Sequence, residues 1–128
     1  MNGFDDDQMG SILEESAEES LRQFMRDAER RHFPKAPLVA ELEVISARDP
    51  ATLTPNHVIQ VSKNIIVNQK MCKVLVIHEL IHHWLFHRDN GDADVKEGPR
   101  FQVEVERLWR EGAYKRPCSL AGMLENPL

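Results

Sequence analysis

The residues best suited to chemistry lie in HELIHHWLFH, residues 78–87, which holds four of the chain's six histidines among apolar neighbours. His78 and His82 are four residues apart, so on a helix their imidazoles project from one face at a spacing that suits a single metal ion. Glu79 directly follows His78, where its carboxylate can act as a base beside the metal rather than as a ligand. This HExxH arrangement predicts a zinc peptidase with His78 and His82 as ligands and Glu79 as general base.

The simpler alternative is a histidine-rich core in which the rings satisfy one another by hydrogen bonds. Glu79 weighs against it, because an unpaired carboxylate inside an apolar helix costs on the order of several kcal/mol. His83 and His87 form a second pair four residues apart, rotated by about 100° from the first on helical geometry, so they do not serve the same ion. We expect His83 to be a packing residue and His87 to interact favourably with the helix dipole, the alternative being a second metal on this pair.

A zinc site needs a third protein ligand. The downstream acidic candidates are Asp89, Asp92, Asp94, Glu97, Glu104 and Glu106. HELIHHWLF, followed after a polar loop by GPRF, resembles the SprT-like (Spartan-type) metalloprotease domain, whose pattern is HExxH, a loop and then H-G-P-x-F. HVIQVSKNII is similar to the short strand before that family's active-site helix, so the resemblance covers about residues 57–105. It implies a zincin-like minimal metalloprotease domain that cleaves protein or peptide substrates with zinc.

One residue departs from the family's pattern. Glu97, fifteen residues after His82, stands where the family has its third histidine ligand, so the resemblance implies a His78, His82, Glu97 metal site. A carboxylate in this position shifts the preference somewhat towards Mn²⁺ or Fe²⁺, although Zn²⁺ remains the expected ion. The alternative is an ordinary acidic residue ahead of the helix that Pro99 opens.

Two rival functions stay open. One is a gluzincin-type peptidase, in which Glu104 or Glu106 of the last helix is the third ligand. The other is a non-catalytic domain of the same fold, in which the metal only stabilises a surface that binds a partner protein. In the peptidase reading Glu79 takes a proton from the attacking water and passes it to the leaving amine. Further oxyanion donors are then needed, and the sequence does not select among the candidates. These are His57, His83 and Tyr114.

The surrounding elements follow from periodicity and from proline and glycine. Apolar spacing predicts an amphipathic helix over residues 11–33, with Ser11 and Glu14 as a capping box and Pro34 and Pro37 as its end. Alternation predicts strands over residues 38–46, with Leu38, Ala40, Leu42 and Val44 on one face, and over residues 57–62, with a loop over 47–56 between them. A long helix, apolar nearly all round and therefore central, runs from about residue 68 to Asn90-Gly91. Pro99 opens the last helix, which ends at Gly112 and buries Phe101, Val105, Leu108 and Trp109.

These elements predict an α+β domain with an N-terminal helix, a small β-sheet, a central HExxH helix and a C-terminal helix. At 128 residues we expect a single domain, with irregular segments over residues 1–10 and 115–128. Cys72 and Cys118 are too few for a disulfide framework and are expected to be free thiols.

The net charge of −5 argues against phosphate binding as the main source of affinity, so a nucleic-acid partner rests on the resemblance alone. The basic stretches over residues 26–32 and 113–117 are expected to be solvated surface. With no apolar segment long enough to span a membrane and no secretory signal, the expected location is cytoplasmic or nuclear.

Overall fold

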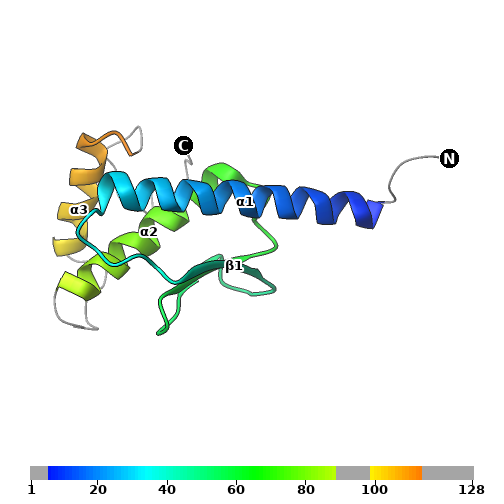
Figure 1. Ribbon diagram of the computed structural model, residues 1–128, viewed down its shortest axis with the longest axis horizontal. Coiled ribbons are helices and arrows are strands. Elements are labelled where there is room, and N and C mark those ends of the chain that lie inside the picture. The colour runs from blue at the N-terminus through cyan, green and yellow to red at the C-terminus, as the bar shows by residue number, and fades with distance from the viewer. Residues whose placement is uncertain (1–5, 89–98, 114–128) are drawn as a thin grey trace.

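The computed structural model describes residues 6–88 and 99–113, and residues 6–13 by their backbone alone. The elements are α1 (Asp6–His32), β1 (Glu41–Ile45), β2 (Ala51–Leu53), β3 (Val58–Ser62), α2 (Gln69–Arg88) and α3 (Pro99–Arg110). Figure 1 shows the long α1 lying above the sheet, with α3 beside the C-terminal end of α1. The expected α+β class is confirmed at this level. No helix within the described ranges is long and apolar enough to cross a membrane.

The three strands form one sheet in the order β1-β3-β2. β1 runs parallel to β3, with Leu42 opposite Ile59, and β2 runs antiparallel to β3, with Thr52 opposite Gln60. The prediction of a loop over residues 47–56 is wrong for β2, because a strand of three residues is too short to produce a recognisable alternation. β3 lies where the sequence predicts a strand.

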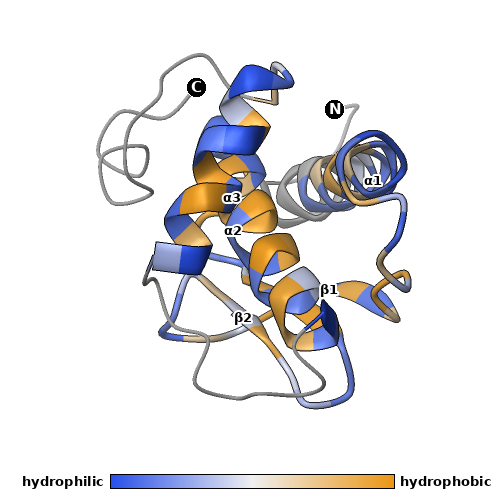
Figure 2. Cartoon of the chain, turned by 90° about the vertical axis from the view of Figure 1, so that its left-hand side faces the viewer, coloured by the Kyte–Doolittle hydropathy of each residue, from blue (hydrophilic) through white to orange (hydrophobic). Residues whose placement is uncertain are grey.

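The helix α2 is the centre of the core, as its apolar sequence predicts. Figure 2 shows it in largely hydrophobic colours between α1, α3 and the sheet, and it contacts all three. Its buried apolar residues are Cys72, Val74, Leu75, Val76, Ile77, Leu80, Ile81 and Leu85. A helix that is apolar on every face is stable only when it is covered on every face, so α1, α3 and the sheet are required together.

The helix α1 begins earlier than its sequence signals indicate. It starts at Asp6, so residues 6–10 are helical where an irregular segment is expected, and Ser11 lies inside the helix rather than at its cap. The helix ends at His32, ahead of Pro34, as predicted.

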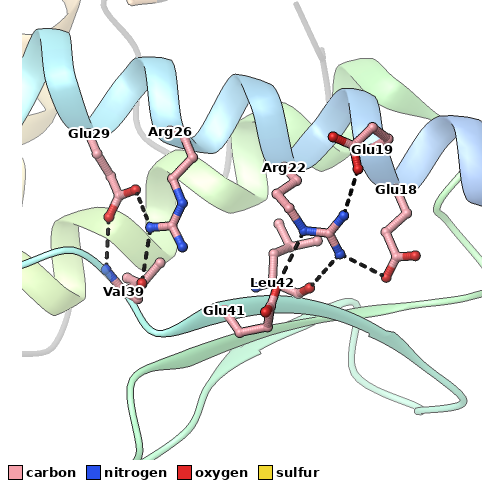
Figure 3. A network of polar contacts seen from close by, with 8 residues as sticks. All are labelled: Glu18, Glu19, Arg22, Arg26, Glu29, Val39, Glu41 and Leu42. Atoms are coloured by element: carbon pink, nitrogen blue, oxygen red, sulfur yellow. Dashed lines mark hydrogen bonds and ion pairs between the residues drawn. The ribbon is translucent and has the colours of Figure 1, made fainter.

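Charged side chains of α1 form hydrogen bonds with the backbone of the edge strand β1 and of the residues just before it (Figure 3). The guanidinium of Arg22 donates to the Leu42 carbonyl at 3.2 Å, and that of Arg26 donates to the Val39 carbonyl at 3.0 Å. The Val39 N–H donates to the Glu29 carboxylate at 2.8 Å, and Glu29 also accepts from Arg26 at 2.8 Å. These contacts join α1 to β1 through backbone groups that would otherwise need water.

The burial pattern just before β1 is the reverse of the predicted one. Val39 is 1% exposed and Leu38 is 65% exposed, although the alternation assigns Leu38 to the inner face. The strand begins only at Glu41, so the two-residue period does not apply to residues 38–40. Within the strand, Leu42 is buried as expected.

The helix α3 begins at Pro99 and its last turn closes at Gly112, as predicted. Gly112 has a φ of 83°, which is a left-handed conformation that favours glycine. Phe101, Val105 and Leu108 are buried as expected. The prediction that Trp109 is buried is wrong, because it is 40% exposed, and Glu104 is the fourth buried residue instead.

Removing the Glu29 carboxylate should destabilise the fold. Glu29 is 3% exposed, so Glu29→Ala leaves the Val39 N–H and the Arg26 guanidinium without this carboxylate acceptor. We expect the free energy of unfolding to fall by about 2–4 kcal/mol. Urea unfolding measures this difference. The control is Glu19→Ala, which removes a 73% exposed partner of Arg22 and should cost less than about 0.5 kcal/mol. Equal costs for the two variants would contradict this account of the α1–β1 contact.

The Cys72 thiol should be unreactive in the folded protein. It is fully buried with its thiol directed at the Ile65 carbonyl, and burial raises the pKa of the Cys72 thiol to about 11. At pH 8 roughly one thiol in a thousand is then ionised. In a Cys118→Ser background, Ellman's reagent should react with Cys72 only after denaturation. Reaction of the native protein at the rate of an exposed thiol would contradict this prediction.

Candidate metal centre

The imidazoles of His78 and His82 converge on one side of α2. Their Nε2 atoms lie 3.0 Å apart, and the ring centroids are 4.7 Å apart. Two nitrogens bound to one tetrahedral zinc at roughly 2.0–2.1 Å lie roughly 3.3 Å from each other. The arrangement in the protein therefore needs only a small side-chain adjustment to place both Nε2 lone pairs on one ion.

The ring of Phe101 packs against both histidines. Its centroid lies 5.1 Å from that of His78 and 4.9 Å from that of His82, and Phe101 itself is fully buried. Because Phe101 belongs to α3, the packing of α3 on α2 restricts the rotation of both imidazoles. The sequence predicts that Phe101 is buried, and the resemblance implies that it packs this helix on the HExxH helix. The contact with both candidate ligands adds a positioning role.

Glu79 stands on the same helix, about 100° round the axis from His78. It is 8% exposed and is followed by the buried apolar residues Leu80 and Ile81. A carboxylate in such surroundings is costly to bury, so its presence next to the histidine pair calls for a functional or pairing role. His78 and His82 are themselves partly exposed, which gives the pair access from solvent.

No third ligand for the histidine pair is found among the residues that the structure describes. Within residues 6–88 and 99–113, no group of three histidine, cysteine or acidic side chains could hold a metal ion. Glu97, the expected third ligand, lies outside these residues, as does the oxyanion-donor candidate Tyr114. Three of the other acidic candidates, Asp89, Asp92 and Asp94, also lie outside them.

The remaining candidate ligands belong to α3, and neither joins the histidine pair. Glu104 is 4% exposed and accepts hydrogen bonds from Trp84 Nε1 at 2.6 Å and from Arg107 Nε at 2.7 Å. Both of its oxygens are therefore occupied, one by Trp84 of α2 and the other by Arg107 of α3. Glu106 is exposed on the outer side of α3. A gluzincin-type site with a ligand from this helix is not supported by these contacts.

His83 and His57 form a second histidine contact that sequence reasoning missed. His83 is 3% exposed, and its Nε2 donates to the Pro37 carbonyl at 2.7 Å. Its Nδ1 must then accept the hydrogen bond from Nδ1 of His57, 3.3 Å away. Burial lowers the pKa of His83, partly offset by the hydrogen bond to Pro37. Both ring nitrogens of His83 are thus occupied, which supports the packing role and not a second metal with His87.

The only local signal for this contact is the turn that precedes β3. His57 has a φ of 63°, a left-handed conformation that non-glycine residues rarely adopt, and it follows Pro55 and Asn56. The sequence marks the turn, but it does not reveal that the ring at its end reaches α2. His57 and His83 are hydrogen-bonded to each other, so these contacts do not direct either ring towards a substrate oxyanion.

No protein-family model matches the sequence, and no curated protein matches it significantly.

Two matched substitutions separate the candidate carboxylates. Glu97→Gln removes the proposed third ligand, so zinc affinity, measured by competition with a chromogenic chelator, should fall about tenfold or more. Glu104→Gln should leave zinc affinity unchanged but lower the free energy of unfolding by about 1–3 kcal/mol, since Arg107 loses its buried ionic partner. A loss of zinc affinity in Glu104→Gln, with Glu97→Gln unaffected, would reverse the assignment.

Proposed function

We propose that this chain is a zinc-dependent metallopeptidase of zincin-like, SprT-like architecture, in which His78 and His82 bind the metal and Glu79 is the general base. The observation that carries the proposal is the 3.0 Å approach of the two Nε2 atoms on the central helix, beside a buried carboxylate. A packing role explains two neighbouring imidazoles, but it does not use the carboxylate that stands next to them on the same helix. Metal-dependent hydrolysis uses all three groups.

The donor set suits zinc. Two imidazoles and one carboxylate make a three-ligand site that leaves a coordination position open for water or substrate. Glu97 completes this set by the resemblance of EGPRF to the family's H-G-P-x-F pattern. An oxygen donor in the third position makes Mn²⁺ or Fe²⁺ weaker alternatives to Zn²⁺. Phe101 supports the set, because its ring fixes the orientation of both imidazoles.

The chemistry assigned to the chain's own residues is a proton transfer. When bound, zinc supplies a water of lowered pKa and polarises the carbonyl of the scissile peptide. The Glu79 carboxylate accepts the proton of the attacking water at one oxygen and then delivers it to the nitrogen of the leaving amine. One water is consumed, one peptide bond is broken, and Glu79 returns to its ionised form.

The order of elements also supports the assignment. An N-terminal helix, a small sheet, the HExxH helix and a final helix follow one another as the resemblance implies. The substrate class that this chemistry implies is a protein or peptide. The resemblance adds proteins bound to DNA, but two of the basic residues within 26–32 pair with carboxylates, Arg26 with Glu29 and Arg30 with Asp27. These pairs give no support to a phosphate-binding face on α1.

The rival function is a non-catalytic domain of the same fold, in which the metal stabilises a protein-binding surface. A structural metal site has no use for a base beside its ligands, so the buried Glu79 favours catalysis over this alternative. If Glu79 instead had only a structural role, its substitution would impair folding rather than hydrolysis by a folded protein.

Replacing Glu79 separates the two functions. Glu79→Gln keeps the size of the side chain and removes the base, so we expect hydrolysis of a denatured protein substrate to fall about a hundredfold or more while zinc remains bound. Peptide release and bound zinc are measured on the same preparation, with Glu43→Gln, an exposed acid on β1, as the control. Full activity in Glu79→Gln would sink the peptidase proposal. Zinc binding in the parent without hydrolysis would favour the structural role.

A further inference from the structure

A cavity lies away from the histidine pair, where the end of α1 meets α2 and α3. Its volume is about 430 Å³, and it is lined by residues 31–35, by Trp84 of α2, by Glu104 and Arg107 of α3, and by Glu111 just after that helix. None of His78, Glu79 and His82 lines it. The volume lies within the range of pockets that hold small organic ligands. Figure 1 shows the C-terminal end of α1 beside α3 at this end of the molecule.

The acidic residues of the cavity are already paired. Glu104 accepts from Trp84 and Arg107 as described above, and Glu111 accepts from His32 at 2.8 Å and from Arg107 at 2.8 Å. Burial would raise the pKa of Glu111, but the hydrogen bonds from His32 and Arg107 outweigh it and lower that pKa. Both carboxylates are bound to the protein's own donors, so they do not recruit an external cation.

Two cations of the cavity have no such partners. Arg31 and Lys35 are exposed, and neither makes an ion pair within the part of the chain that the structure describes. Among the arginine, lysine and glutamate side chains of the lining, three cations and two carboxylates leave one net positive charge. That balance favours a ligand with a single negative charge over a dianion, which the two carboxylates would repel.

Part of the cavity wall is aromatic and apolar, contributed by Phe33, Pro34 and Trp84. Phe33 offers little of this surface, because it is 5% exposed and the Arg107 guanidinium lies 5.3 Å from the centre of its ring. Trp84 is held in place by its bond to Glu104, and Pro34 adds a rigid apolar surface. Flat rings packed at such walls gain from burial and from aromatic contact. The lining therefore combines one excess positive charge at the rim with fixed aromatic surface.

We propose that this cavity binds a small aromatic carboxylate, with the ring against Trp84 and Pro34 and the carboxylate held by Arg31 and Lys35. The site does not depend on the metal centre, because it shares none of its candidate ligands. It therefore stands or falls separately from the peptidase proposal. The carboxylate could belong to a free small molecule or to the C-terminus of a peptide, and the two sources present the same group.

The test uses Trp84 as the reporter. The chain has two tryptophans, and Trp109→Phe leaves Trp84 as the sole source of indole fluorescence. Titration of this variant with 3-phenylpropionate should give a saturable change in emission with a dissociation constant of about 1 mM, as expected for a ligand of this size. The uncharged analogue 3-phenylpropanamide should bind about tenfold more weakly. Equal binding of the acid and the amide, or no saturable response to the acid, would overturn the proposal.

Charge reversal locates the site. The double substitution Arg31→Glu and Lys35→Glu should weaken binding of 3-phenylpropionate about tenfold, whereas Lys63→Glu, at an exposed position that does not line the cavity, should not. Circular dichroism checks that all variants fold. Unchanged binding in the double variant would place the ligand elsewhere and contradict the assignment. Tighter binding of N-acetyl-alanyl-phenylalanine than of 3-phenylpropionate would identify a peptide C-terminus as the source, and the reverse order a free acid.

Discussion

The burial of α2 is the constraint on which the rest of this structure depends. Its apolar residues occur on every side, so no single partner can remove them from water. The helix α1, the sheet and α3 each cover part of it (Figure 2). Each partner also brings polar groups into the core, and those groups decide where the protein is held rigid and where it offers chemistry.

Two kinds of polar group pack on this core, buried carboxylates and a partly exposed histidine pair. Glu29 and Glu104 are buried carboxylates whose contacts join neighbouring elements, to the backbone before β1 in one case and between α2 and α3 in the other. The histidine pair differs, because the Nε2 atoms of His78 and His82 face each other at 3.0 Å and the proposed binding of an ion would use both of their lone pairs. Phe101 connects the two kinds, since the helix that Glu104 anchors is the one that places this ring on the imidazoles.

Sequence reasoning succeeds here where a pattern is long or a residue has one structural use. The central helix follows from its apolar run, and α1 and α3 end at proline and glycine as their geometry requires. It fails where tertiary pairing decides. A strand of three residues, β2, exists because β3 pairs with it, and Glu104 takes the buried position expected for Trp109 because Trp84 and Arg107 satisfy its charge.

The candidate site shows the same division. Helical spacing predicts that His78 and His82 meet, and they do. It cannot predict the contact between His57 and His83, which joins a turn before β3 to α2. The assignment of Glu97 as the third ligand rests on the resemblance, because Glu97 lies outside the described residues.

Metal content tests the central claim most directly. Elemental mass spectrometry of protein purified without added metal should find about one equivalent of zinc in the parent and in His87→Ala, an exposed histidine of the same helix, and little in His82→Ala. A folded parent that contains no metal and takes up no added zinc would contradict the account.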